Sequence, residues 1–160
     1  MIATKTIQDA FAADHDRLDQ CLQKFQAMKR SDFAGAKQFF KEFKFGLQRH
    51  IIWEETILFP LFEQKTGMVR CGPTEVMRTE HRRIGECLEA IHQKVKAQDP
   101  HSDPEEQALL EALTIHNEKE ETILYPALDR LLSDDEKAAA FVAIEKVPEE
   151  AYRTCCGRRV

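Results

Sequence analysis

The chain has 160 residues and a formal net charge of −5, with only six glycines and six prolines. A chain of this length buries roughly two thirds of its unfolded surface as one domain, so it needs neither disulfides nor a structural metal to fold. The acidic balance leaves no basic stripe for phosphates, which argues against nucleic acid as a partner.

The chain shows no apolar run of signal-peptide length, and no stretch approaches the roughly 20 apolar residues that span a bilayer. We therefore expect a cytoplasmic protein with no membrane partner. The five cysteines are odd in number and lack a paired spacing, which predicts free thiols in a reducing compartment.

Helical periodicity and capping residues predict four long helices and a short fifth one. Ser31–Asp32 offers an N-cap for the second helix, Asp103 offers one for the fourth, and Ser133 with Glu136 forms a capping box for the fifth. The expected spans are about 6–29, 33–64, 74–97, 103–132 and 133–146.

Short connections make sequential helices antiparallel neighbours. The predicted fold class is therefore all-α, an up-down-up-down antiparallel four-helix bundle with a short C-terminal fifth helix. Residues 1–146 are expected to form this bundle, and residues 147–160 a C-terminal tail.

A segment that begins with a histidine recurs 66 residues later along the chain. His50-Ile-Ile-Trp-Glu-Glu-Thr-Ile-Leu-Phe-Pro60 matches His116-Asn-Glu-Lys-Glu-Glu-Thr-Ile-Leu-Tyr-Pro126, and His15 and His81 are separated by the same offset. A helix brings positions i and i+4 onto one face, so each copy presents an imidazole beside a carboxylate. This is a metal-ligand arrangement, and its doubling suggests two metals.

The rise of about 1.5 Å per residue places the four histidines at comparable depth in the bundle, so they can converge on one interior site. The alternative is a set of core histidines and surface acids, but chance does not readily repeat six such residues in register. Imidazole and carboxylate ligands suit first-row metals, and the lack of a thiolate cluster disfavours structural zinc. Iron is the first choice, with manganese or zinc as substitutes, and the candidate ligands are His15, His50, Glu54, His81, His116 and Glu120.

Residues beside these ligands receive other interpretations. Glu55 and Glu121 lie one step around the helix and are expected outside the ligand set or in solvent, and Tyr125 is expected to be core. Trp53 either lines the pocket or covers the bundle edge, and Lys119 at the matching position favours the edge. Pro60 and its repeat equivalent are expected to distort their helices beyond the site rather than at it.

The remaining histidines and cysteines receive structural interpretations. His92 has no histidine counterpart in the repeat and is read as structural, and His101 as a loop residue. Cys21 and Cys87 are read as small packing residues. Cys155-Cys156 could be a redox pair or a metal contact, although a flexible terminus is the commoner explanation.

The repeated ligand set resembles the hemerythrin-like HHE cation-binding family over roughly residues 5–132. The resemblance implies a non-haem di-iron centre, oxo- or hydroxo-bridged, inside a four-helix bundle. It further implies that His15 and His50 hold one iron, His81 and His116 hold the other, and two glutamates bridge them. Those bridging residues are Glu54 and Glu120.

The sequence departs from the oxygen-carrying hemerythrins in its third helix. In the carriers the third helix has two histidines at positions i and i+4. In this chain His81 is followed at that spacing by Gly85. The iron near His81 should lose one nitrogen ligand and gain an exchangeable position. This set resembles the iron-sulfur-centre repair and nitric-oxide-response branch of the family more than the carriers.

Three functions are compatible with this sequence. The leading hypothesis is a di-iron protein that binds or reacts with O2 or NO in sensing, storage, iron delivery or repair, or detoxification. The second is an enzyme, a peroxide or NO reductase that uses the same centre. The third is a helical interaction module with a structural metal.

Overall fold

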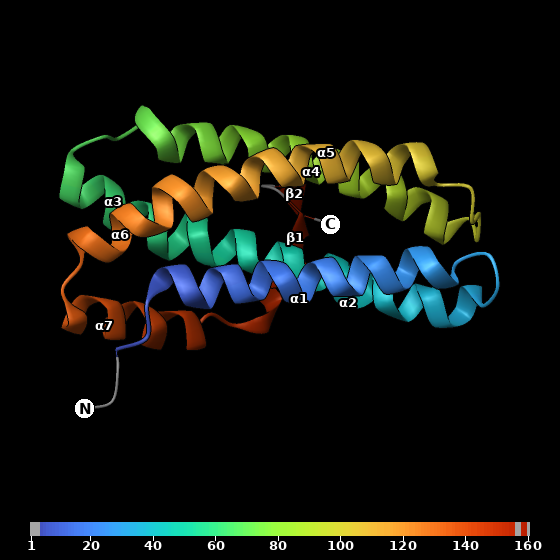
Figure 1. Cartoon of the computed structure of the whole chain (residues 1–160), viewed down its shortest axis with the longest axis horizontal. Helices are drawn as coiled ribbons and strands as arrows, with labels where there is room; N and C mark the ends of the chain where they lie inside the picture. The colour runs from blue at the N-terminus through green and yellow to red at the C-terminus, as the bar shows by residue number, and fades with distance from the viewer. Residues whose placement is uncertain (1–3, 156–157, 160) are drawn as a thin grey trace.

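A computed structural model describes residues 4–155 and 158–159 of the chain (Figure 1). Four long helical rods run antiparallel to their neighbours in sequence, as predicted for an up-down-up-down bundle. The first and third rods are α1 (Ile7–Met28) and α4 (Gly72–Lys96). Each of the other two rods combines two α-helices and a π-helical turn: α2 (Phe33–Trp53), η1 (Glu54–Leu58) and α3 (Phe59–Thr66) in one, α5 (Asp103–Lys119), η2 (Glu120–Leu124) and α6 (Tyr125–Leu131) in the other.

Capping residues set several of these helix starts. Asp32 accepts a hydrogen bond from the Gly35 backbone N–H at 3.0 Å, and Ser133 forms the predicted capping box with Glu136. The fourth rod begins at residue 103, as expected, but Asp103 is its first helical residue and Ser102, rather than Asp103, is its N-cap.

The core consists of two apolar clusters separated by a layer of buried polar side chains. Every long rod passes from one cluster to the other, and the layer falls at the crossing point. On α1, for example, His15 lies between Phe11 of one cluster and Leu18 of the other, and on α4 His81 lies between Met77 and Ile84. The bundle therefore places buried polar side chains from all four rods at the same depth along its long axis.

The π-helical turns begin at Glu54 and Glu120 and end just before the segments that contain the two prolines. In each turn a backbone N–H bonds the carbonyl five residues earlier, from Phe59 to Glu54 and from Tyr125 to Glu120. The expectation that each proline distorts its helix only beyond the site is wrong. The altered turn begins at the glutamate itself, because a proline cannot donate its own helical hydrogen bond and the preceding turn widens.

A buried ion pair joins the first and fourth rods at the end of the bundle that carries the α1–α2 loop. Lys29 is 2% exposed, and its ammonium group contacts the carboxylates of Glu106 and Asp103. Glu106 also accepts a hydrogen bond from Ser102 at 2.5 Å, and Arg30 adds an exposed contact to Asp103 at 2.8 Å. These bonds satisfy the buried charges of this loop region.

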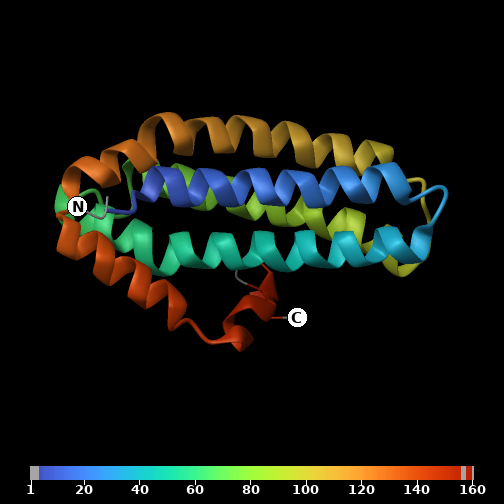
Figure 2. The ribbon, with the colours of Figure 1, turned by 60° about the horizontal axis from the view of Figure 1, so that its bottom comes forward.

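The C-terminal region folds back along α2 (Figure 2). It comprises α7 (Asp134–Glu145), the 3-10 helix η3 (Glu149–Arg153) and a two-stranded hairpin of β1 (Thr154–Cys155) and β2 (Arg158–Arg159). Tyr152 is buried there, and its hydroxyl accepts a hydrogen bond from Trp53 Nε1 at 2.7 Å. Trp53 therefore covers the bundle edge, as its repeat position indicated. Across the described residues, no helix has a stretch long and apolar enough to cross a membrane.

The contribution of the buried Lys29–Glu106 ion pair to the free energy of unfolding can be tested by substitution. Replacing Lys29 with Ala should lower the free energy of unfolding by about 3–5 kcal/mol, because Glu106 would remain buried without its counter-charge. Arg30→Ala removes only an exposed contact and should have a much smaller effect on stability. Urea denaturation followed by circular dichroism measures both, and equal small effects would show that Lys29 is not needed.

Candidate metal centre

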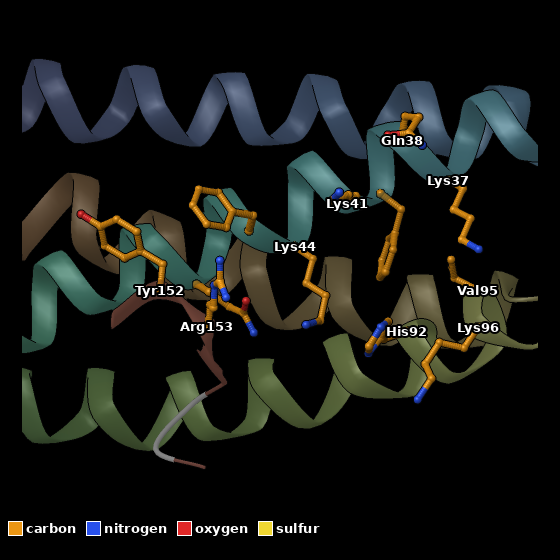
Figure 3. A pocket seen from close by; sticks show the side chains of 12 residues that line it. Lys37, Gln38, Lys41, Lys44, His92, Val95, Lys96, Tyr152 and Arg153 are labelled. Atoms are coloured by element: carbon orange, nitrogen blue, oxygen red, sulfur yellow. The ribbon is translucent and has the colours of Figure 1, made fainter. Parts of the chain in front are cut away.

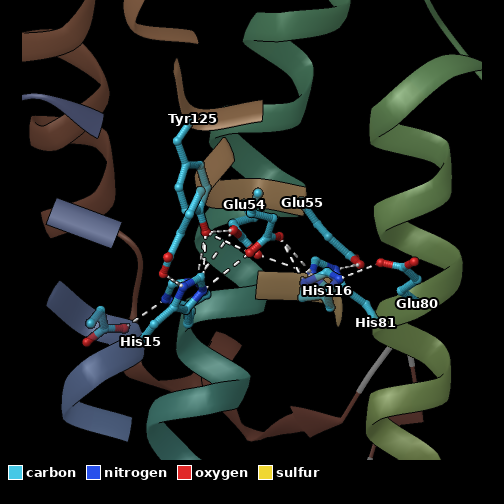
Figure 4. A network of polar contacts seen from close by, with 11 residues as sticks. His15, Glu54, Glu55, Glu80, His81, His116 and Tyr125 are labelled. Carbon is cyan, nitrogen blue, oxygen red and sulfur yellow. Dashed lines mark hydrogen bonds and ion pairs between the residues drawn. The ribbon is translucent and has the colours of Figure 1, made fainter. Parts of the chain in front are cut away.

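All six predicted ligand side chains meet in the polar layer of the bundle (Figure 4). None is more than 4% exposed, and Glu54, His81 and Glu120 are fully buried. Ligand atoms of Glu54, His81, His116 and Glu120 all lie within 4.8 Å of one another, and so do those of His15, His50 and Glu120. The structure thus brings together two overlapping groups that each could hold a metal ion.

Each glutamate turns one oxygen toward each histidine pair. Glu54 Oε1 lies 3.4 Å from His50 Nε2, and its Oε2 lies 3.2 Å from His81 Nε2. Glu120 Oε2 lies 3.3 Å from His15 Nε2, and its Oε1 lies 2.9 Å from His116 Nε2. Both carboxylates therefore span the space between the two histidine pairs, as bridging ligands must.

A carboxylate behind each imidazole orients its ring. The Nδ1 atoms of the four histidines contact carboxylate oxygens at 2.7–2.9 Å. Because a carboxylate only accepts hydrogen bonds, each Nδ1 carries a proton and donates it, so Nε2 is the nitrogen that faces the centre and can bind either a proton or a metal. The pairs are His15 with Glu121, His50 with Asp14, His81 with Glu55, and His116 with Glu80.

These partners divide into two types. Glu55 and Glu121 reach across to the other half of the repeat, which places them outside the ligand set, as expected. Asp14 and Glu80 bond the histidine of the next rod within their own half, and sequence reasoning missed both. The signal was available, because Asp14 and Glu80 are also 66 positions apart and each precedes a repeated histidine.

The donor set fits a cation. His81 Nε2 and His116 Nε2 lie 3.1 Å apart, and their Nδ1 protons are already committed to carboxylates. In addition, Glu54 Oε2 and Glu120 Oε1 are buried and make no hydrogen bond. Two buried carboxylates and converging lone pairs require positive charge between them, because an unpaired buried carboxylate is strongly unfavourable.

The same electrostatics shift the pKa values of the surrounding groups. Burial alone would lower the pKa of His50, but attraction to Glu54 and the hydrogen bond to Asp14 outweigh burial and raise the pKa to about 10. Conversely, burial would raise the pKa of Asp14, but the interaction with His50 outweighs it and lowers the pKa to about 2. The pKa of His81 is raised well above its ordinary value, because Glu120 and Glu54 overcome the effect of burial. The cluster therefore attracts positive charge, whether protons or a metal.

Tyr125 belongs to this site as well as to the core, which the sequence did not indicate. Its hydroxyl donates to Glu54 Oε1 at 2.5 Å or to Glu120 Oε2 at 2.8 Å, and it lies 3.2 Å from His50 Nε2. Burial and the two carboxylates raise the pKa of Tyr125 well above 10. Its repeat counterpart Phe59 instead stacks on His81, with ring centroids 5.6 Å apart. The two ends of the centre therefore differ.

Gly85, the two remaining histidines and the described cysteines are not among the residues that meet at the centre. Gly85 is buried on α4, one turn from His81. His92 is half-buried and bonds Glu89, and His101 is an exposed loop residue bonded to Asp99. Among the cysteines whose side chains the structure describes, Cys21 and Cys87 pack on an apolar cluster, and these two and Cys71 are free thiols. Cys156 lies outside the described residues.

A cleft of about 370 Å³ between α1 and α5 leads from the surface to His15. Its lining is rich in acidic side chains, and burial raises the pKa of one of them, Asp19. The acidic residues are Asp16, Asp19, Glu118 and Glu121. This cleft places an acidic opening beside one of the candidate ligands.

Comparison with known proteins agrees with this geometry. Residues 6–128 match the family described as the hemerythrin HHE cation binding domain. The chain belongs to this hemerythrin family. A hemerythrin-like protein of Schizosaccharomyces pombe is 30% identical over 150 residues, which cover 91% of this chain and 72% of the relative.

Some relatives match the chain over a shorter stretch. The iron-sulfur cluster repair protein YtfE of Escherichia coli strain K12 is 47% identical over 45 residues, 28% of this chain. The protein of that name from Shigella boydii matches to the same extent. These matches cover only 20% of the repair proteins. No solved structure matches this chain.

The bridging assignment in this hemerythrin-like site can be tested by substitution. Glu54→Ala or Glu120→Ala removes a carboxylate that has one oxygen facing each histidine pair. Bound metal should therefore fall to one ion or none per chain. Glu55→Ala and Glu121→Ala remove only a ring-orienting contact and should weaken metal binding by about 10–100-fold without changing its stoichiometry. Metal analysis of purified variants measures the stoichiometry, and equal metal loss at all four positions would show that the bridging pair is misassigned.

The raised histidine pKa predicts that stability depends on pH in metal-free protein but not in the same way in metal-loaded protein. Because the pKa of His50 is about 10 in the fold and 6.5 is its ordinary value, its stabilising contribution is complete below pH 6.5 and is lost as pH rises through 10. Chelator-treated protein should therefore melt at a lower temperature at pH 9 than at pH 6.5. Metal replaces protons on the ligands, so loaded protein should not show this fall. A melting temperature of chelator-treated protein that does not change with pH would contradict the assignment.

Proposed function

We propose that this chain is a di-iron hemerythrin-like protein that binds or reacts with O2 or NO. One observation carries the proposal: Glu54 and Glu120 each face both histidine pairs, and each retains a buried oxygen without a hydrogen bond. His15 and His50 would hold one iron, and His81 and His116 the other. Iron would supply reversible one-electron chemistry and exchangeable coordination positions.

The chain's own residues would control what reaches this centre. The apolar clusters on both sides of the polar layer limit the entry of water. Tyr125 holds a proton between the two glutamates, next to the His15 and His50 pair. At the other end Phe59 offers no polar atom, and Gly85 leaves the position one turn from His81 without a side chain. A small diatomic ligand is therefore better accommodated near His81.

The acidic cleft favours a second candidate, the uptake and donation of iron. A short stretch of the chain is also similar to iron-sulfur cluster repair proteins. Asp16 and Asp19 would attract a cation to the opening above His15. This function uses the same centre and differs from ligand binding in whether iron leaves.

The proposal is tested by titrating the iron-loaded protein. Protein reconstituted with two irons per chain should show the near-ultraviolet bands of a bridged di-iron centre. After reduction without oxygen, it should change its spectrum on addition of O2 or NO. No response to either gas would overturn the proposal. Steady consumption of peroxide or NO with an electron donor would favour a reductase, and iron transfer to a metal-free acceptor protein would favour donation.

Gly85→His serves as the comparison variant in that titration. It places an imidazole one turn from His81, which should slow the response to the gases and slow iron loss to chelators. The substitution also crowds a position shaped around glycine, so its folding is checked first by circular dichroism. A folded variant with unchanged spectra and chelator kinetics would show that position 85 does not face the metal.

A further inference from the structure

A second cavity lies on the bundle face opposite the acidic cleft, between α2, α4 and η3 (Figure 3). Its volume is about 620 Å³, within the range of roughly 300–1,000 Å³ that small-molecule sites occupy. None of the six metal-site residues lines it. We call this cavity the basic pocket.

Five cationic side chains surround the basic pocket: Lys37, Lys41, Lys44, Lys96 and Arg153. The first three recur at helical spacing on α2, and like charges at this spacing repel each other. Within the described chain, none of the five is within ion-pair distance of a carboxylate. This concentration of unpaired positive charge is notable in a protein with a net charge of −5.

Glu89, an acid that contacts the pocket residue His92, is already engaged. Glu89 bonds Gln93 at 2.5 Å and lies 3.3 Å from His92 Nδ1, although its charge also acts on Lys44. Figure 3 shows Lys44 extending from α2 toward His92 on α4. Excess positive charge therefore remains in the pocket and would be stabilised by an anion.

Gln48 supplies an independent indication of a ligand. It lines the pocket one turn beyond Lys44, is only 5% exposed, and its Nε2 has no hydrogen-bond partner. A buried amide donor without an acceptor is unfavourable, because it has lost its hydrogen bonds to water and gained none in the protein. A ligand oxygen or ring nitrogen in the pocket would provide that acceptor.

Aromatic rings form the remaining walls. Phe40 stacks on His92 with centroids 6.3 Å apart, and Phe45 packs edge-on against Tyr152 at 5.7 Å. Rings of this kind pack well against a flat aromatic group. The pocket thus combines an apolar, aromatic part with a strongly positive part.

We propose that the basic pocket binds a phosphorylated aromatic small molecule of the mononucleotide class. A phosphate monoester carries a charge of about −1.5 to −2 at neutral pH, which suits several lysines better than a single carboxylate would. The ring lies among Phe40, Phe45, His92 and Tyr152, and Gln48 donates to the ligand. This site is separate from the metal centre, so the proposal does not depend on the proposed function.

Calorimetric titration of the metal-loaded protein tests the site with defined probes. Adenosine monophosphate or flavin mononucleotide should bind with a Kd below about 100 μM, a modest affinity for a small ligand. Adenosine lacks the charge and inorganic phosphate lacks the ring, so each should bind at least tenfold more weakly. The nucleotide affinity should fall as salt is raised.

Matched variants locate the binding. Lys41→Gln with Lys44→Gln should weaken nucleotide binding at least tenfold, whereas Lys24→Gln with Lys146→Gln changes the net charge equally outside the pocket and should have no effect. Gln48→Leu should weaken binding several-fold while leaving the ligand-free protein as stable or more stable, because it removes an unsatisfied buried donor.

Several outcomes would overturn the proposal. They are the absence of nucleotide binding below 1 mM, equally tight binding of inorganic phosphate, and tighter binding of an acidic peptide than of any nucleotide. Unchanged nucleotide affinity in the Lys41 and Lys44 double variant, or in Gln48→Leu, would also place the ligand elsewhere. None of these results depends on whether the metal centre responds to O2 or NO.

Discussion

Two carboxylates, Glu54 and Glu120, are buried side by side at the middle of the bundle, and the surrounding structure compensates their charge. Neither is exposed to solvent, so their charge must be balanced by groups inside the protein. Four imidazoles supply this balance, and four further carboxylates nearer the surface hold those imidazoles in place. The layer is thus an ordered series of charges, negative, positive and negative, from the surface to the centre, and every rod contributes side chains to it.

The backbone conformation also helps to place Glu54 and Glu120 in the centre of the bundle. Each glutamate opens a π-helical turn, and a proline two residues beyond the end of that turn prevents a regular helical bond. A widened turn rotates the residues that follow it relative to a straight α-helix. As a result Glu54 can face inward while the next residue, Glu55, reaches across to His81. Adjacent glutamates then play different roles, which a uniform helix would not arrange as readily.

Much of the fold and of the centre could be predicted because the chain repeats itself. The 66-residue offset and the i, i+4 pairs identified all six side chains that meet, and the capping residues located the helices to within a few positions. Tyr125 was missed because an aromatic residue at a helical core position looks the same in sequence whether or not its hydroxyl has a partner. The basic pocket was missed for a different reason. Lysines on α2 and α4 gather only when two distant segments and the C-terminal 3-10 helix pack together.

Several differences between the two halves of the repeat lie next to the ligands. One turn after His15 the chain has Asp19, which lines the acidic cleft, whereas one turn after His81 it has Gly85, which is buried. Tyr125 places a hydroxyl beside the first histidine pair, and Phe59 places only a ring beside the second. A symmetric bundle would offer two equivalent metal positions with the same access and the same neighbours. Here one position adjoins a charged opening and a proton donor, and the other adjoins the Phe59 ring and the side-chain-free position of Gly85. We infer that the repeat supplies a common ligand frame, and that these few substitutions give the two metal positions different neighbours and different access.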